Sequence, residues 1–294
     1  MAWLLDPYDW WIRPFVDLAF LRDTLWAALL TVLCTSVIGT WVVLRGLSFL
    51  GDALAHGVLP GIAVAFVLGQ NTTIGALVAA FAMVLGVHAV KASSPLPDDA
   101  SIGVLFVGFL ALAVVIMSSG SATGAGDLTR FLFGSITAVG RDDLVTLAVV
   151  TSIVLVGVVV LHRPLVVGTF DPTQATLIGF RPKLAHLALL VLLALAIVAS
   201  FETVGSLLVF AFLVAPPATA TLLVRRVPAI MAVAVAIGAA CSVVGLLVSY
   251  HHGTATGASM ALVNVTVFVG SLMISRVEAA LRSIGRRRAA APVG

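Results

Sequence analysis

Long apolar runs follow one another through almost the whole chain, and they constrain its fold more than any other feature. A helix needs roughly 20 apolar residues to cross a bilayer, and runs of about this length recur with short polar breaks between them. Charged residues make up only 10% of the sequence, against about 25% in soluble domains. The chain is therefore predicted to be all-α: a polytopic transmembrane helical bundle.

We expect eight or nine spans in one transmembrane domain over residues 24–275. The predicted spans are 24–44, 52–69, 72–90, 102–119, 144–161, 184–200, 204–224, 229–250 and 258–275. The uncertain number comes from 120–143, which is half apolar and predicts a re-entrant or an interfacial helix. The tryptophan-rich residues 1–23 are predicted to lie at the membrane interface, and residues 276–294 to form a basic cytoplasmic tail.

Basic residues near the span ends predict the orientation, because loops rich in Lys and Arg remain in the cytoplasm. One side can collect Arg45, Lys91, Arg163, Arg181, Lys183, Arg225, Arg226 and the C-terminal arginines. The other side then holds the N-terminal segment, Glu202 and the stretch YHHGTATG, while Arg130 and Arg141 do not fit the pattern. The N-terminus is predicted outside and the C-terminus in the cytoplasm.

Two ionisable residues stand four positions apart in the second span, within FLGDALAHGVLPG. Asp52 and His56 share one face of a helix, and such groups inside a membrane usually face a partner or a polar pathway. Three interpretations are open. The pair forms a local hydrogen bond, or Asp52 lies at the wet end of the helix and complements its dipole, or the pair binds a divalent ion such as Mn(II), Fe(II) or Zn(II).

Two ligands are too few to bind a metal ion tightly within one chain. A two-fold dimer whose copies face each other across a pore would supply four, which suits a site that an ion passes through. Pro60, with Gly57 and Gly61 beside it, predicts a bend in the same helix and is a candidate for gating motion.

The stretch FDPTQATLIGF, residues 170–180, interrupts the spans on the basic side. It begins with Asp171 and Pro172 and predicts one or two turns of helix. Ala175 and Gly179 form a small-x-x-x-small pair that would expose backbone to a cytoplasmic partner. An ordinary connecting loop is the alternative interpretation.

Two adjacent prolines, Pro216 and Pro217, lie near the end of the span predicted over 204–224. Proline removes a backbone donor and disturbs the helical hydrogen-bond ladder. We therefore predict a kinked or broken helix there, as a second candidate for gating.

Motifs of several enzyme classes are missing from the sequence. There is no G-x-x-x-x-G-K-[ST], because Lys91 and Lys183 are followed by Ala and Leu, so the chain is not itself a P-loop ATPase. There is no H-E-x-x-H of a zinc protease either.

Cys34 and Cys241 lie in apolar runs and are predicted to pack as small residues. The net charge of +3 is concentrated in the C-terminal tail, so it gives no indication of nucleic-acid binding.

Five stretches together resemble the permease subunits of zinc and manganese ABC transporters, the ABC-3 family. They are FLGDALAHGVLPGIA, DDASIGVLF, FDPTQATLIGF, VGSLLVFAFLVAPPATA and GLLVSYHHGTATGASMAL. They occur in the family's order and cover most of the chain from about residue 25 to 275. The tryptophan-rich N-terminus and the arginine-rich tail lie outside the shared pattern.

The resemblance implies a non-catalytic plasma-membrane subunit of an importer for manganese, zinc or iron(II). Such permeases form dimers, dock two cytoplasmic ATPase subunits that bind the ATP, and receive the metal from an extracytoplasmic solute-binding protein. No cofactor of its own is expected beyond the transported ion. The family's metal-pathway Asp and His fall on Asp52 and His56, and its ATPase-contacting segment falls on Asp171 through Gly179.

Two rival functions use the same pair differently. A proton-coupled secondary transporter would use Asp52 and His56 as a proton relay and would need neither an ATPase nor a docking segment. A membrane enzyme would use them as acid and base, but no nucleophile lies within reach in the sequence. The favoured hypothesis is ATP-driven import by alternating access.

Overall fold

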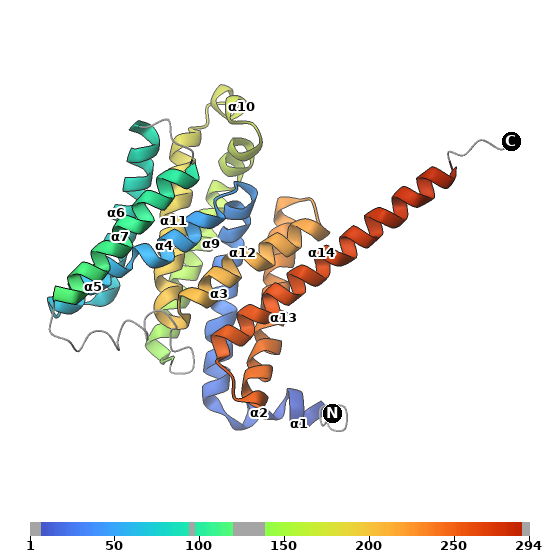
Figure 1. Cartoon of the computed structure of the whole chain (residues 1–294), viewed down its shortest axis with the longest axis horizontal. Coiled ribbons are helices and arrows are strands. Elements are labelled where there is room, and N and C mark those ends of the chain that lie inside the picture. Colours follow the sequence, from blue (N-terminus) through green and yellow to red (C-terminus); the bar gives the residue numbers. More distant parts are fainter. Residues whose placement is uncertain (1–6, 94–97, 120–138, 290–294) are drawn as a thin grey trace.

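The computed structural model describes residues 7–93, 98–119 and 139–289, and all regular structure within these ranges is helical (Figure 1). The helices are α1 (Pro7–Trp11), α2 (Arg13–Asp17), α3 (Ala19–Leu44), α4 (Ser48–Gly57), α5 (Leu59–Val67), α6 (Thr72–Ser93), α7 (Asp98–Ser119), α9 (Arg141–Phe170), α10 (Pro172–Leu177), α11 (Pro182–Val204), α12 (Ser206–Leu223), α13 (Val227–His252) and α14 (Thr256–Ala289). In the described part, nine segments are long and apolar enough to cross a membrane, with α4 and α5 forming one of them. The predicted all-α bundle is confirmed, with nine candidate spans.

The spans run alternately between two ends of the molecule. In Figure 1, α10 marks one end, and α1 and the turn from α13 to α14 lie at the other. The last turn of α7 and the first turn of α9 lie on the side away from α10. The helix predicted within 120–143 falls mostly on residues 120–138, which are outside the described residues, and Arg141 already begins α9.

The gap between the predicted spans 144–161 and 184–200 is mostly helical, and this corrects the predicted end of the earlier span. Helix α9 continues from the expected span end to Phe170 with Pro164 in its interior, and α10 follows after a single residue. The extension buries Leu165 completely. Burial of this apolar turn offsets the backbone hydrogen bond that Pro164 cannot donate.

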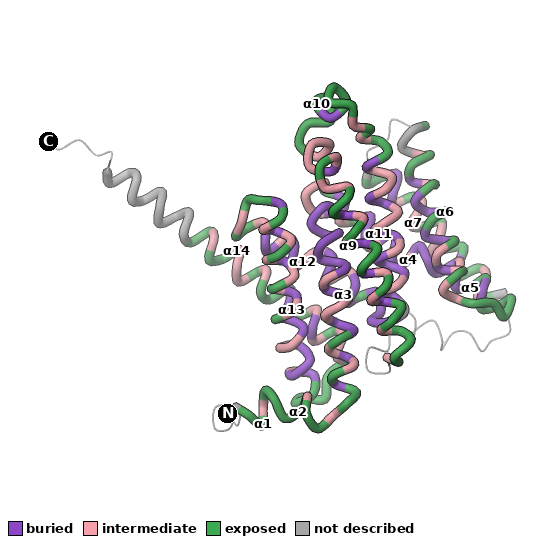
Figure 2. Tube along the Cα trace, turned by 180° about the vertical axis from the view of Figure 1, so that it is seen from behind, coloured by how far each residue is buried: buried purple, intermediate pink, exposed green. Residues whose placement is uncertain are grey.

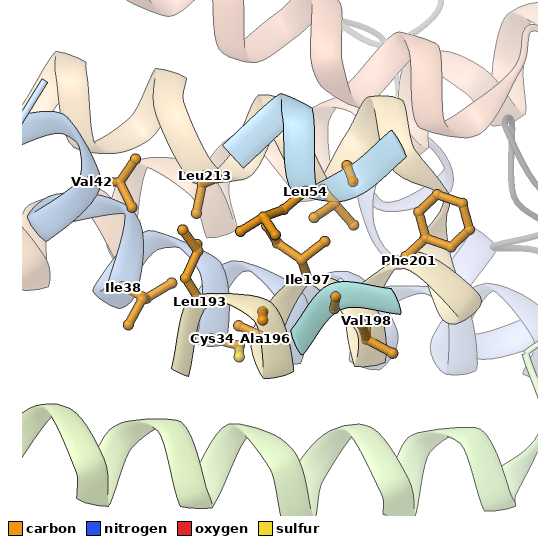
Figure 3. Packing of buried hydrophobic residues seen from close by; sticks show 14 of the residues in the cluster. Cys34, Ile38, Val42, Leu54, Leu193, Ala196, Ile197, Val198, Phe201 and Leu213 are labelled. Atoms are coloured by element: carbon orange, nitrogen blue, oxygen red, sulfur yellow. The ribbon is translucent and has the colours of Figure 1, made fainter. Parts of the chain in front are cut away.

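The core lies where α3, α4, α11 and α12 meet (Figure 3). Side chains of all four helices interdigitate there, among them Ile38, Leu54, Ile197 and Leu213. Cys34 belongs to the same cluster, and both cysteines are buried free thiols, as predicted. This packing fixes one side of α4 and leaves the other side to carry polar groups.

Helix α12 is continuous through Pro216 and Pro217, so the predicted break does not occur. The two prolines leave the carbonyls of Phe212 and Leu213 without their i+4 donors. The hydroxyl of Ser36 on α3 donates to the Phe212 carbonyl at 3.3 Å. Gly39, one turn further along α3, lies so close that a Cβ there would overlap the Leu213 carbonyl oxygen. A neighbouring helix therefore supplies a donor to one of the two carbonyls, as happens elsewhere in membrane bundles.

Both ends of the chain extend beyond the bundle. The N-terminal segment is held against the end of α13, where the rings of Trp10 and His251 stack at 4.3 Å and His251 Nε2 donates to the Trp10 carbonyl at 3.2 Å. At the other terminus, α14 continues past its candidate span, which ends at Val277, as far as Ala289. Figure 1 shows this extension of α14 leaving the bundle.

Candidate functional site

Helix α4 places Asp52 and His56 on the side opposite its buried face. Leu50, Ala53 and Leu54 are buried, at the spacing of one helical face. Asp52 and His56 point away from that face, with 33% and 25% of their side-chain surface exposed. The expected shared face is therefore present, and it is accessible within a candidate membrane span.

The two side chains are close but do not form a hydrogen bond. His56 Nε2 lies 3.7 Å from Asp52 Oδ1, beyond the 2.7–3.2 Å typical of such bonds. Two ligands of one tetrahedral ion, each about 2.1 Å from it, would be about 3.4 Å apart. The observed separation lies within the 4.0 Å range of an ion pair, and it is also close to the spacing of two ligands of one ion. His56 Nδ1 is buried and has no hydrogen-bond partner among the described residues.

Aromatic rings close the side of the pair that faces α7. The Phe106 ring meets the His56 ring at a centroid distance of 6.0 Å and the Phe49 ring at 6.1 Å, both close to edge-on. Phe106 limits the positions that the imidazole can take. Phe106 is the last residue of the stretch DDASIGVLF. The sequence gives it no role, because its contact with His56 joins two separate helices.

The described part of the chain contains no group of three or more His, Cys, Asp or Glu side chains that could hold a metal ion together. His251 and His252 lie exposed at the far end of α13. Within the described residues, no third side chain of these kinds therefore joins Asp52 and His56, and their role as metal ligands stays a prediction.

The helix that carries the pair ends one residue after His56. Helix α4 stops at Gly57, Val58 lies between the two helices, and α5 begins at Leu59 with Pro60 in its first turn. Proline is tolerated there, because the first turn lacks intrahelical acceptors for its N–H groups. The predicted bend near Pro60 is confirmed as an interruption between two helices, and its role in gating stays a prediction.

The predicted short helix in 170–180 is confirmed as α10. Asp171 is its N-cap, and its Oδ1 accepts a hydrogen bond from the Gln174 backbone N–H at 2.8 Å. Pro172 occupies the first helical position, and Gly179 follows the helix with a φ of +91°. Figure 2 shows α10 at one extremity of the molecule, largely exposed.

One detail of this segment differs from the prediction. Ala175 is completely buried, because it is the residue through which α10 packs onto the helices below it, and so it cannot expose backbone to a partner. Leu177 and Ile178 are instead 82% and 60% exposed. These two apolar side chains are the ones that the segment exposes, and the spacing argument did not single them out, although the TLIGF letters contain them.

Arg45 connects the helices near α10 with the start of α4. It follows the last residue of α3 and precedes Ser48, the first residue of α4, by three positions. Its Nε donates to Thr169 Oγ1 at 2.9 Å, and a terminal nitrogen donates to His186 Nδ1 at 3.1 Å. The short link before the polar pair is thereby tied to the end of α9 and to α11.

A family model for the ABC 3 transport family matches residues 17–275. The chain belongs to the ABC 3 transport family. It is accordingly a multi-pass plasma-membrane protein of ABC transport systems, and the resemblance that the five motifs suggested is confirmed.

Individual members of the ABC 3 transport family match over nearly their whole length. The manganese transport system membrane protein MntC of Halalkalibacterium halodurans is 36% identical over 273 residues, which cover 92% of this chain and 93% of the relative. A protein of Haemophilus influenzae named "Probable iron transport system membrane protein" is 34% identical over 271 residues, covering 92% of this chain and 99% of the relative.

A solved structure of the same family has the same fold. A chain of PsaBC from Streptococcus pneumoniae, solved in complex with a Fab, superimposes with a TM-score of 0.79 at 31% identity. The match covers 89% of this chain and 94% of that chain. The arrangement of α3 to α14 is thus a family architecture.

Proposed function

We propose that this chain is the membrane-spanning subunit of an ATP-driven importer for a divalent transition metal, and that Asp52 and His56 are ligands on the path of the ion. The observation that carries the proposal is the accessible carboxylate–imidazole pair, with Oδ1 and Nε2 3.7 Å apart, inside a candidate span of an ABC 3 family chain. Ionisable groups are retained at such positions chiefly for transport or proton transfer.

The ion is proposed to be Mn(II), Fe(II) or Zn(II). Carboxylate oxygen and imidazole nitrogen suit these ions better than Cu(I), which prefers sulfur ligands. The names of the relatives, a manganese transport protein and an iron transport protein, agree with the first two. Because two ligands per chain are few, a second copy of the chain is proposed to face the first and complete the site with its own pair.

The energy is proposed to come from a separate cytoplasmic ATPase subunit that docks on α10. Support comes from the exposed Leu177 and Ile178 at the tip of the molecule and from the family itself. Movement of α10 would be passed through the end of α9 and Arg45 to the link before α4. A solute-binding protein would deliver the ion to the opposite face, and the chain itself would perform no catalysis.

The proton-coupled carrier is not supported, since the family is one of ABC transport systems. The two mechanisms differ in what drives uptake. We would reconstitute the chain in vesicles with its ATPase and binding protein and measure uptake of radioactive manganese, either with ATP or with a pH gradient alone. Uptake that requires ATP is the expected result, and uptake driven by the gradient without ATP would overturn the proposal.

Two variants test the proposed ligand role of Asp52 and His56 in the same uptake assay. Asp52→Ala and His56→Ala are expected to abolish uptake while the ATPase still co-purifies with the chain. Asp142→Asn is the matched control, because Asp142 is an exposed acid in the first turn of α9, outside the pair. Normal uptake by both alanine variants would mean that the pair has only a structural role.

A further inference from the structure

The positive charge of Arg45 has no counter-charge within the described part of the chain. Its guanidinium is half-buried, and its three hydrogen bonds go to neutral acceptors on Thr169, His186 and the Leu165 carbonyl. No described carboxylate lies within 4.0 Å of it. Burial lowers the pKa of Arg45, although a guanidinium remains charged at neutral pH. A partly desolvated cation of this kind favours a bound anion.

This guanidinium lines a cavity beneath α10, which we call the docking-helix pocket. The pocket has a volume of about 490 Å³, and its lining includes Arg45, Pro172, Thr173, Lys183 and His186. No Asp or Glu is among its lining residues. The nearby carboxylate of Asp171 bonds the backbone of Gln174 instead. The cavity therefore joins two cations, Arg45 at the end of α3 and Lys183 of α11, and its described lining contains no acid.

Other groups around the pocket also suit an anion. Pro182 and Lys183 are the first two residues of α11, a helix of 23 residues whose N-terminus has no side-chain cap. The first N–H groups of a helix lack intrahelical acceptors, and the helix dipole adds partial positive charge there. Thr173 of α10 also lines the cavity. Two cationic side chains, a hydroxyl and a helix N-terminus thus line one pocket, and a phosphate has enough acceptor oxygens to meet several of these groups.

We propose that the docking-helix pocket binds a phosphate group, held by Arg45 and Lys183. Two sources share this chemistry: the headgroup of an anionic phospholipid and inorganic phosphate. The location favours the lipid, because α3, α9 and α11 all enter or leave the membrane beside the pocket. The bound group would bridge α3, α10 and α11. This site is independent of the Asp52–His56 pair and of the ion that the pair binds.

The test uses the full chain, purified in a neutral detergent, and follows thermal unfolding by tryptophan fluorescence. Phosphatidylglycerol or inorganic phosphate is titrated at constant ionic strength. A ligand that binds only the folded state raises the midpoint of unfolding with its concentration. The expected result is a saturable rise with at least one of the two probes. A rise with the lipid alone assigns the headgroup as the source, and a rise with inorganic phosphate assigns the free anion.

Lys183→Gln is the decisive variant, because Lys183 is exposed and its replacement leaves the packing intact. It is expected to need about tenfold more ligand for half of the effect, as for loss of one charge-assisted contact. Arg225→Gln is the control: an exposed cation between α12 and α13 that does not line the pocket. Arg45→Gln is a second variant in which both affinity and basal stability should fall.

Two results would overturn the proposal. One is that neither probe shifts the midpoint of unfolding. A pocket that instead receives an acidic side chain of a docked protein would give this result. The other is an equal response of the wild-type chain, Lys183→Gln and Arg225→Gln, because it would mean that the anion binds to general surface charge.

Discussion

His56 Nε2 and Asp52 Oδ1 lie 3.7 Å apart on the accessible side of α4, which is too far for a mutual hydrogen bond and is compatible with an ion pair or a shared ion. Asp52→Asn separates these two interpretations. Asparagine keeps an acceptor oxygen for His56 but loses the charge that a divalent ion requires. We expect manganese uptake by the reconstituted complex to fall by about tenfold or more, since even supporting groups of metal ligands change affinity by 10–100-fold.

The control for this variant is its thermal stability, which is expected to stay within about 0.5 kcal/mol of the wild-type value because no hydrogen bond is lost. Normal uptake by a stable Asp52→Asn chain would instead assign the pair to a mutual hydrogen bond, because asparagine keeps the acceptor oxygen.

The N-cap of α10 gives the second prediction. Asp171→Ala removes the acceptor for the Gln174 N–H and should destabilise α10 by about 1 kcal/mol. We expect weaker association of the ATPase subunit, measured by co-purification or surface plasmon resonance. Asp171→Asn is the matched control, because asparagine caps a helix about as well as aspartate. Equal loss of association in both variants would point to the charge of Asp171.

The contact between Ser36 and the Phe212 carbonyl gives the third prediction. Ser36→Ala leaves a buried carbonyl without a donor and should lower the free energy of unfolding by about 1–3 kcal/mol. In a Pro216→Ala background the alanine N–H can donate to Phe212 instead, so the same serine change should cost much less. Denaturation of the four proteins in a double-mutant cycle measures this coupling, and strictly additive effects would contradict the explanation given for the continuity of α12.

The interruption between α4 and α5 gives the fourth prediction. Pro60 lies in the first turn of α5, where proline removes no intrahelical hydrogen bond. Pro60→Ala should therefore change the free energy of unfolding by less than about 1 kcal/mol. If the interruption is a hinge, uptake should fall and its maximal rate and half-saturating metal concentration should change together. Unaltered uptake kinetics would show that the interruption serves only packing.

The spans and the polar pair could be predicted from the sequence because each has a local cause. Apolar runs of bilayer length specify helices, and an acid and an imidazole four residues apart specify one helical face. The same reasoning placed a short helix after Asp171, where a capping residue precedes proline. These signals lie within a few residues of the structure that they produce.

The errors arise where distant residues decide the outcome. Pro216 and Pro217 predicted a kinked or broken helix, and the helix is unbroken; Ser36, which donates to Phe212, lies 176 positions from it in the sequence. The sequence predicts that Ala175 is a small exposed residue, whereas in the structure α10 packs onto its neighbours through Ala175. The place of Phe106 beside His56 likewise depends on how α7 packs against α4, which no local pattern encodes.

If Asp52 and His56 are the ligands, a set of two donor atoms per chain also limits how long an ion stays. If such a site holds its ion with a dissociation constant of about 10 μM and the ion arrives at about 10⁸ M⁻¹s⁻¹, it leaves at about 10³ s⁻¹. Enzyme-like turnover numbers are about 1–10³ s⁻¹, so release from α4 would not limit throughput. A third ligand on the same chain would lengthen the dwell time and make the pathway a trap.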